Sequence, residues 1–356
     1  MADSEVFKTP SRPLKRPCLG KDKRPTETEY SPITIPPSPM MKKLGCGTGV
    51  IVYKLDRGSF SPSLGTTRRS PWAIKKAKRM RQEALERLKR ESEILKMLNH
   101  PNIISYRQFT LMENGDGCLS MEQGGISLDT LIERYGEEDM AFTAKEVASV
   151  SLFVARALSY LHDTHKLLHG DVKSGNVLIT DDFKHVKLCD FGVALKMKED
   201  LSGPLDPSEF YTGTQPWCSK EVLEDGPITD KADIFAYGLL IWEMLALDIP
   251  HVKLMTDGDD EENSDDPDRS FVSDSHNEDA YTEALGTRPA LPNRNFDSDY
   301  LPMIGLFACC TEADYKKRPC ATQCAKAIEP LAKELNVISC SIVDGELIDN
   351  SYKKTL

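Results

Sequence analysis

Residues 169–192 constrain the fold of this chain more than any other stretch, because they place polar side chains among strand-like apolar runs. They read HGDVKSGNVLITDDFKHVKLCDFG, in which Asp171, Asn176 and Asp190 border short apolar segments. Such segments bury themselves, so their polar side chains must emerge where the strands end. Carboxylate and amide oxygens at neighbouring turns suit magnesium, which takes one or two carboxylates and leaves its other positions to water and phosphate. The stretch therefore predicts a metal site beside a substrate hydroxyl.

Length and composition predict a large core and no membrane span. The chain has 356 residues, of which 40% are hydrophobic and 28% are charged, as in ordinary globular proteins. Its longest apolar run, 234–247, is interrupted by Glu243 and is too short to cross a bilayer, and the N-terminus has no apolar leader. The ten cysteines lack metal-like spacing, which favours reduced thiols. We expect a protein of the cytoplasm, the nucleus or both.

Charge is distributed unevenly along the chain. Residues 8–24 hold seven Lys or Arg and one Asp, whereas residues 257–279 hold eleven Asp or Glu and one Arg. Dense like charge with few apolar residues predicts a mobile acidic insertion at 256–280, which either docks a basic partner or keeps the surface soluble. Residues 1–41 contain eight prolines and are expected to be a disordered basic tail. No aromatic residues interleave the basic run, so nucleic acid is not an expected partner.

The order of the motifs in 169–192 resembles the protein kinase family, in which an HRD loop with a downstream Asn precedes DFG. Either motif alone would be weak evidence, but both occur here in the family's order. The resemblance implies that Asp171 accepts the proton of the attacking hydroxyl and that Lys173 neutralises the transferred phosphoryl group. It also implies that Asn176 and Asp190 bind Mg²⁺, with ATP as the other cofactor.

Two upstream motifs resemble the nucleotide-binding half of a kinase. Residues 44–53 read LGCGTGVIVY, in which glycines let backbone amides approach phosphate oxygens. The third glycine comes one residue earlier than in the family pattern, because Val50 takes its place. Residues 71–76 read PWAIKK, and Lys75 would contact the α- and β-phosphates. The residues that the resemblance assigns to nucleotide binding here are Gly45, Gly47, Gly49, Val52, Ala73 and Lys75.

A helix is expected at 78–99, where apolar residues recur at three- and four-residue steps. Glu91 lies on the apolar side of this helix, and a buried carboxylate needs a partner because unpaired buried charge is costly. The resemblance implies that Lys75 is this partner and that Glu91 thereby serves nucleotide binding. The sequence also fits a solvated Glu91.

Residues 118–125 read CLSMEQGG and are expected to form a strand that ends in a hinge. The resemblance implies that the backbone of Glu122 and Gln123 binds adenine and that Met121 gates the pocket behind it. Leu178, which follows the catalytic loop, completes the implied nucleotide-binding residues.

The second half of the chain has the helical periodicity of a larger lobe. Helices are expected at 127–135, 144–162 and 230–247. The resemblance implies that 193–221 is the activation segment and that its last residue, Glu221, pairs with Arg318. It also implies that Asp233 hydrogen-bonds the backbone of the catalytic loop, as a structural contact.

Gly170 departs from the family pattern, because most kinases have Arg at this position. That arginine normally binds a phosphate in the activation segment through a charge-assisted bidentate contact, which glycine cannot make. We therefore expect control from elsewhere, either from a partner or from phosphorylation in the tail. Thr9 is followed by Pro10 and lies among basic residues, so it is the expected target of an upstream proline-directed kinase.

These features predict an α+β, bilobal protein-kinase fold, with a small mainly β N-lobe carrying one helix and a larger mainly α C-lobe. The expected parts are a tail (1–41), the N-lobe and hinge (42–125), the C-lobe (126–332) and a second tail (333–356).

The predicted function is ATP-dependent phosphorylation of protein substrates on Ser or Thr. Lys173 and Thr214 are typical of the Ser/Thr class, but dual-specificity kinases that act on mitogen-activated protein kinases share them, so Tyr stays open. The chain resembles that kinase-kinase group, which implies MAP-kinase-like substrates and a role in mitosis and signalling. A PDZ ligand would need Ser or Thr where Lys354 stands, so the C-terminus does not support one.

Two other functions fit parts of the sequence. A catalytically impaired scaffold, binding partners through the tail and the acidic insertion, is favoured by the altered glycine loop, by Gly170 and by Ser219 and Lys220 in place of the usual Ala-Pro. An unrelated nucleotide- or nucleic-acid-binding module rests only on the glycine loop and the basic tail.

Overall fold

The computed structural model of the chain describes residues 41–47, 49–56, 71–180, 182–256 and 273–337. They belong to one compact unit that begins at Met41. Thr9, the basic tail up to residue 40, most of the acidic insertion and the C-terminus from residue 338 lie outside the described residues. Met41 itself is 8% exposed and belongs to the core, although the sequence assigned it to the tail.

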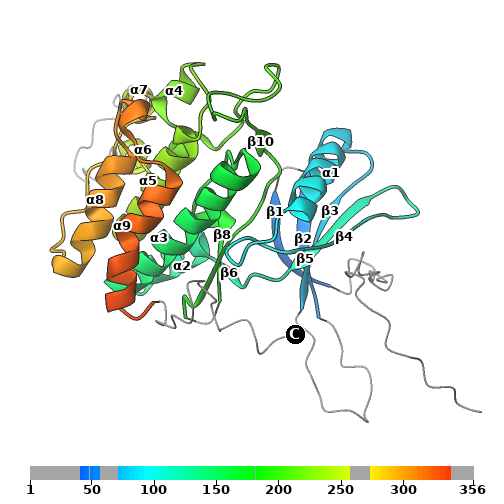
Figure 1. Cartoon of the computed structure of the whole chain (residues 1–356), viewed down its shortest axis with the longest axis horizontal. Helices are drawn as coiled ribbons and strands as arrows, with labels where there is room; N and C mark the ends of the chain where they lie inside the picture. Colours follow the sequence, from blue (N-terminus) through cyan, green and yellow to red (C-terminus); the bar gives the residue numbers. More distant parts are fainter. Residues whose placement is uncertain (1–40, 48, 57–70, 181, 257–272, 338–356) are drawn as a thin grey trace, which may run out of the picture. The chain divides into compact units, whose positions relative to one another are not determined.

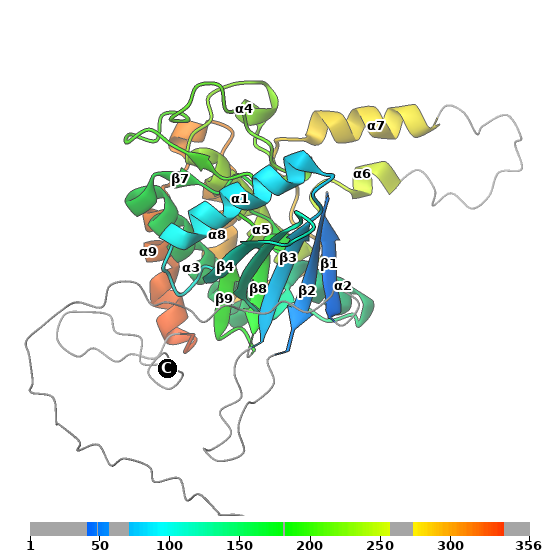
Figure 2. The same cartoon turned by 90° about the vertical axis from the view of Figure 1, so that its right-hand side faces the viewer.

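An antiparallel sheet and one helix make up the first half of the described chain (Figure 1). The strands are β1 (Lys42–Gly47), β2 (Val50–Leu55), β3 (Trp72–Ala77), β4 (Tyr106–Leu111) and β5 (Gly117–Glu122), in the order β1-β2-β3-β5-β4. Helix α1 (Gln82–Met97) lies along the sheet (Figure 2). A Cβ at Gly117 would lie 2.5 Å from the Leu85 side chain, so glycine lets α1 pack directly on β5.

Helix α1 is shorter at both ends than the predicted helix at 78–99. Residues 78–81 form a turn instead, closed by a bond from Arg81 N–H to Lys78 O, and no side chain caps the helix start. At the other end Leu98 is extended, with ψ of 131°. Pro101 follows closely and cannot continue a helix. Periodicity thus located the helix, whereas local turn geometry set its ends.

Helices dominate the second half of the described chain (Figure 1). They are α2 (Leu128–Glu137), α3 (Ala144–Ser159), α4 (Lys220–Leu223), α5 (Lys231–Ala246), α6 (Lys253–Thr256), α7 (Ser273–Ala284), α8 (Leu301–Cys310) and α9 (Ala321–Glu334). Helix α5 is buried over almost its whole length, as expected for a helix that is apolar on all sides. The predicted α+β arrangement, with a mainly β first half that carries one helix and a mainly α second half, is confirmed.

Short strands hold the loops that carry the polar residues of 169–192. Strand β7 (Leu167–Leu168) pairs with β10 (Leu195–Lys196), and β8 (Val177–Thr180) lies between β6 (Ile126–Ser127) and β9 (His185–Leu188). The side chains of these strands are largely buried. The polar residues therefore emerge at the strand ends, as the alternation of apolar and polar runs predicted.

Three boundaries differ from the sequence prediction. Helix α3 ends at Ser159 and continues as a π-helical turn, Tyr160–Thr164, in place of one helix over 144–162. Helix α7 starts inside the range predicted as a mobile insertion, 256–280. Helix α9 runs to Glu334, past the predicted start of the C-terminal tail. Among the described helices, none combines the length and apolar character needed to cross a membrane.

Candidate active site

Three charged side chains from separate elements meet between the sheet and the helical half. Lys75 on β3 donates to Glu91 Oε2 on α1 and to Asp190 Oδ1 after β9, each at 2.8 Å. Lys75 is 7% exposed and Glu91 only 1%, so Glu91 is paired and buried, not solvated. An ammonium group has three protons. Two are used here, which leaves one donor for a ligand.

The three charges shift one another's pKa. Burial alone would lower the pKa of Lys75, but Glu91 and Asp190 outweigh it and hold that pKa above its usual value. Burial alone would raise the pKa of Asp190, but Lys75 and the N–H of Gly192 lower it overall. For Glu91 burial prevails over the attraction of Lys75, and the pKa rises to about 7. At neutral pH the site therefore holds a cation and an ionised Asp190, with Glu91 near its titration point.

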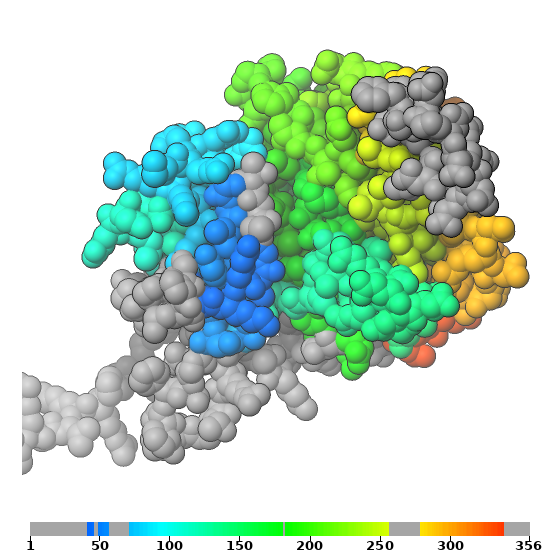
Figure 3. All heavy atoms as spheres, turned by 180° about the vertical axis from the view of Figure 1, so that it is seen from behind, coloured from blue at the N-terminus to red at the C-terminus, as the bar shows by residue number. Residues whose placement is uncertain are grey.

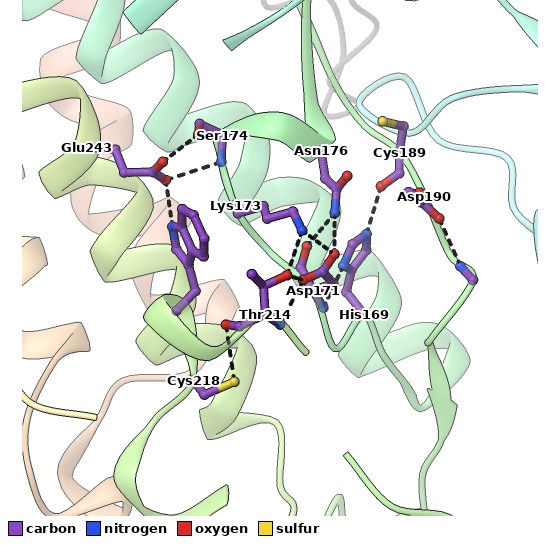
Figure 4. Close-up of polar contacts among 12 residues, drawn as sticks. His169, Asp171, Lys173, Ser174, Asn176, Cys189, Asp190, Thr214, Cys218 and Glu243 are labelled. Carbon is purple, nitrogen blue, oxygen red and sulfur yellow. Dashed lines mark hydrogen bonds and ion pairs between the residues drawn. The ribbon is translucent and has the colours of Figure 1, made fainter. Parts of the chain in front are cut away.

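Asp171 lies in the loop between β7 and β8, and both its carboxylate oxygens are engaged (Figure 4). Oδ1 accepts hydrogen bonds from the N–H and the hydroxyl of Thr214, at 3.1 and 2.6 Å. Oδ2 accepts from Asn176 Nδ2 and lies beside Lys173 Nζ, each at 2.9 Å. Lys173 Nζ also donates to Thr214 Oγ1 at 2.6 Å. Asp171 is thus held in one orientation with a cation beside it.

A buried carboxylate on α5 fixes the backbone that precedes Asp171. Asp233 is fully buried and accepts from the N–H groups of His169 and Gly170, at 2.8 and 2.9 Å. Its Oδ2 also lies 2.8 Å from His162 Nε2. These are the backbone contacts implied for Asp233, and they make it a scaffold residue.

Asn176 and Asp190 present oxygen atoms suited to a divalent metal. Asn176 Nδ2 donates to the backbone oxygen and the carboxylate of Asp171, which leaves Oδ1 open. Asp190 Oδ1 accepts from Lys75 and Gly192, which leaves Oδ2. Within the described residues, no three His, Cys, Asp or Glu side chains gather closely enough to hold a metal alone. The donors fit a hard cation that completes its shell with phosphate and water.

The protein kinase domain model matches residues 41–327, which include every element that carries this site. The chain belongs to the protein kinase family.

Three relatives of this kinase differ widely in how much of each chain the similarity covers. The Lymphokine-activated killer T-cell-originated protein kinase of Homo sapiens is 45% identical over 331 residues, covering 91% of this chain and 97% of that protein. Probable serine/threonine-protein kinase drkC of Dictyostelium discoideum is 29% identical over 248 residues, covering 68% of this chain and 31% of that protein. Mitogen-activated protein kinase kinase kinase 13-B of Xenopus laevis is 31% identical over 188 residues, covering 53% and 18%.

The glycine loop of this kinase is the turn between β1 and β2. Gly45 pairs with Val52, and Gly47 at the end of β1 pairs with Val50. Val52 also faces Lys75 across the β2–β3 pair. Of the predicted loop residues, Val52 therefore lies next to Lys75. Figure 3 shows a groove between the blue residues of these strands and the teal residues of α2.

Gly49 has a packing role that the sequence did not predict. Its φ is 81°, and a Cβ there would lie 2.9 Å from the Cβ of Ala84 on α1. The displaced third glycine thus lets the turn approach the start of α1. A cavity of ≈ 280 Å³ lies here, and of the predicted site residues only Gly49 lines it. Its lining residues are Gly49, Arg81, Gln82, Glu83, Ala84 and Arg87.

The predicted adenine-binding residues line the hinge side of the site. Ala73 on β3 pairs with Met121 on β5, and both are 7% exposed. A Cβ at Gly124 would lie 2.5 Å from Leu178 Cδ1, so the hinge runs directly over Leu178. In the chain, Gln123 lies between Met121 and Gly124.

For Glu122 the structure distinguishes between the two backbone groups that could bind adenine, because its N–H is already hydrogen-bonded. That N–H donates to Ser105 O at 2.9 Å, so a bond from Glu122 to adenine would have to come through its carbonyl oxygen. Its carboxylate accepts from Ser105 N–H and lies 3.2 Å from Lys187 Nζ. Lys187 also donates to Pro101 O at 2.9 Å. In the sequence, this support is indicated only by a lysine within an apolar strand.

Glu243 is another functional residue that sequence reasoning missed. Its carboxylate accepts from the N–H of Ser174 at 3.2 Å, from the Ser174 hydroxyl and from Trp217 Nε1 at 2.8 Å. It thereby ties the catalytic loop to the end of the activation segment (Figure 4). The sequence signal for this role is that Glu243 is a lone charge within the apolar run 234–247. A charge buried in this way requires polar partners.

The end of the activation segment is fixed by the pair implied for Glu221. Arg318 Nη1 and Nη2 donate to the two oxygens of Glu221, at 2.5 and 3.0 Å. The Arg318 side chain is 0% exposed. Although Ser219 and Lys220 depart from the family motif, this structural pair is present.

Proposed function

We propose that this kinase transfers the γ-phosphate of ATP to serine or threonine of protein substrates. The observation that carries the proposal is the meeting of Lys75, Glu91 and Asp190 beside an Asp171 that is oriented by three neighbours. The serine/threonine kinases among the relatives support this substrate class. Tyrosine stays open, because the sequence features of dual-specificity kinases are the same.

Asp171 accepts the proton of the attacking hydroxyl in this proposal. Lys173 lies beside its carboxylate and places positive charge where the phosphoryl group is transferred. Such fixed charges act in a site that excludes water and do not reorganise during the reaction. Holding both groups in place also lowers the entropic part of the barrier.

ATP and Mg²⁺ would be held by groups that the site leaves open. Lys75 has a free donor for phosphate, and Asn176 Oδ1 and Asp190 Oδ2 would bind the metal. The turn between Gly45 and Gly49 would cover the phosphates, and the backbone of the hinge would bind adenine. ATP would supply the transferable phosphoryl group, and Mg²⁺ would neutralise part of its negative charge.

Substrates and control are proposed at a coarser level. MAP-kinase-like substrates and a role in mitosis and signalling follow from the sequence resemblance, and the cysteine pattern favours the cytoplasm or nucleus. A mitogen-activated protein kinase kinase kinase among the relatives supports a place in that signalling class. An upstream proline-directed kinase acting on Thr9 remains part of the proposal.

Transfer of labelled γ-phosphate to a generic basic protein tests the function. Asp190→Ala should lower kcat on the order of 100-fold or more, since a preorganised electrostatic group is lost. Asp56→Ala is the matched control, because its carboxylate is 76% exposed at the end of β2, and it should leave transfer unchanged.

Two results would contradict the proposal. Transfer unaffected by Asp190→Ala would come from a contaminating kinase. A folded wild-type chain that binds nucleotide but transfers nothing would favour the scaffold function instead.

A further inference from the structure

Thr214 must be placed accurately for the proposed reaction, because it contacts both Asp171 and Lys173, the two groups proposed to act on the reacting hydroxyl and the phosphoryl group. Its N–H and hydroxyl donate to Asp171, and its hydroxyl accepts from Lys173. Thr214 ends the loop 208–214 and directly precedes a short 3₁₀ turn, Gln215–Trp217. Its carbonyl oxygen accepts from the Trp217 N–H at 3.0 Å and from Cys218 Sγ at 3.3 Å, so the backbone is held on the side of Thr214 toward the C-terminus. Residues 208–213 on its other side contain no helix or strand, so another contact has to hold the backbone at 213.

Gly213 shows what lies against that backbone. A Cβ at Gly213 would lie 2.6 Å from Gly170 O, 2.5 Å from Tyr211 Cε1 and 2.8 Å from the Tyr211 hydroxyl oxygen. The turn at 213–214 is thus enclosed between the catalytic loop and the ring edge of Tyr211. Glycine at this position allows the close approach on both sides.

The ring of Tyr211 also has apolar neighbours. It packs against a small apolar cluster formed by Leu168 of β7, Leu195 of β10 and Met197. The preceding residue, Phe210, is 72% exposed, whereas Tyr211 is partly buried. Burial and nearby acidic groups, Asp233 and Asp171 among them, raise the pKa of the Tyr211 hydroxyl, which stays protonated.

The catalytic loop cannot bind a phosphate through residue 170. Gly170 has φ of 79°, and a Cβ there would lie 3.1 Å from Val193 O, so a longer side chain would be strained. The activation segment instead contacts α1 through a carboxylate, since Arg90 Nη1 lies 3.1 Å from Glu209 Oε1. Both side chains of that pair are partly exposed, so it contributes little energy. On the side of Thr214 toward the N-terminus, the packing of Tyr211 is therefore the main contact that supports the turn.

We propose that Tyr211 is a positioning residue for phosphoryl transfer: its ring holds the Gly213–Thr214 turn against Gly170, so that Thr214 fixes Asp171, without the help of a phosphate group. This inference rests on the proposed function. It assigns Tyr211 a role through Thr214, not a contact with substrate.

Three variants test the role of Tyr211, with steady-state kinetics and amide hydrogen exchange at Thr214 as readouts. Tyr211→Ala should lower kcat about tenfold or more, because misplacement by ~1 Å can cost on the order of 100-fold. Its KM for ATP should stay within about twofold, since the contacts of Lys75 are untouched. Exchange of the Thr214 amide, which donates to Asp171, should become faster.

Tyr211→Phe should keep both kcat and slow exchange, because the ring and its packing are retained. Phe210→Ala is the matched control, since it removes an exposed ring next to Tyr211, and it should behave as wild type. If Tyr211→Ala does not fold, Tyr211→Leu takes its place, because it keeps apolar contact with the cluster but removes the ring edge. Tyr211→Leu should lose less kcat than expected for Tyr211→Ala, and its Thr214 amide should exchange faster than in the wild type.

The proposal is overturned if Tyr211→Ala, or Tyr211→Leu in its place, keeps wild-type kcat and exchange, or if Phe210→Ala loses as much activity. It also fails if Tyr211→Phe is as impaired as Tyr211→Ala, because the hydroxyl would then matter and not the packing. A wild-type chain without any transfer would refute the proposed function. The exchange measurement would still decide whether Tyr211 holds Thr214.

Discussion

At the scale of single residues, the site depends on buried charges that constrain one another. Lys75 is shared between Glu91 and Asp190, and the burial of Glu91 raises its pKa to about 7. Only the ionised form of Glu91 can act as the ionic partner of Lys75. The protonation of this one carboxylate therefore couples pH to the geometry of the site.

We predict that kcat/KM rises with pH through an apparent pKa of about 7, because Glu91 ionises there and pairs with Lys75. Glu91→Gln should remove this acidic limb and lower the plateau. The measurement is a pH–rate profile of both proteins at saturating metal. An unchanged limb in Glu91→Gln would assign it to another group.

The contribution of Glu91 to folding stability should fall as pH rises, opposite to the predicted change in activity. The folded-state pKa of about 7 lies above the usual 4.5, so the folded protein binds this proton more tightly than the unfolded chain. The resulting stabilisation is fully present below pH 4.5 and is lost as pH rises through about 7. Activity and the contribution of Glu91 to stability therefore change in opposite directions over this interval.

At the scale of elements, helix starts and ends depend on local side-chain chemistry. Helix α3 begins with a capping box, in which Thr143 Oγ1 accepts from Glu146 N–H at 3.3 Å and Glu146 Oε2 accepts from Thr143 N–H at 2.7 Å. Helix α1 has no such cap. The predicted start of α3, which has the capping box, coincided with the structure. The predicted start of α1, which has no cap, was four residues too early.

Thr143→Ala should reduce the free energy of unfolding by about 1 kcal/mol, since the backbone N–H of Glu146 loses its side-chain acceptor. Thr143→Ser should retain most of the stability, because it keeps the hydroxyl. Urea denaturation of the three proteins checks this. Equal losses in both variants would mean that the threonine methyl group matters and not the cap.

At the scale of the whole molecule, buried ion pairs join parts of the chain that are far apart in sequence. Arg318 holds Glu221 through two hydrogen bonds and also donates to Glu312 O and Lys231 O. Its guanidinium lies over the ring of Phe235, 4.8 Å from the centroid. This one side chain thus fixes the end of the activation segment to α5 and to the loop before α9.

Arg318→Met should lower the free energy of unfolding by about 3–5 kcal/mol, because it leaves a buried Glu221 carboxylate without its partner. Replacing Glu221 by Met as well should restore part of that loss. The double-mutant cycle is measured by denaturant unfolding. Strictly additive losses would show that the two side chains do not stabilise each other.

By itself, the sequence was sufficient for the fold class, for the order of the elements and for the groups expected at the site. Asp171 and Asp190 lie just beyond strand ends, and alternation of apolar and polar residues reports such positions directly. Lys75 lies within β3 and was indicated by its motif. The same periodicity placed Glu91 on the buried side of its helix. These features are local, so they can be recognised without knowing how the chain closes on itself.

Only the tertiary structure decided which distant groups touch. The contacts of Thr214 with Asp171, of Glu243 with Ser174, and of Tyr211 with Gly213 and the cluster around Leu168 all depend on how the activation segment packs on the catalytic loop. Such contacts depend on the packing of many residues together, whereas a sequence pattern reports only neighbours within a few turns.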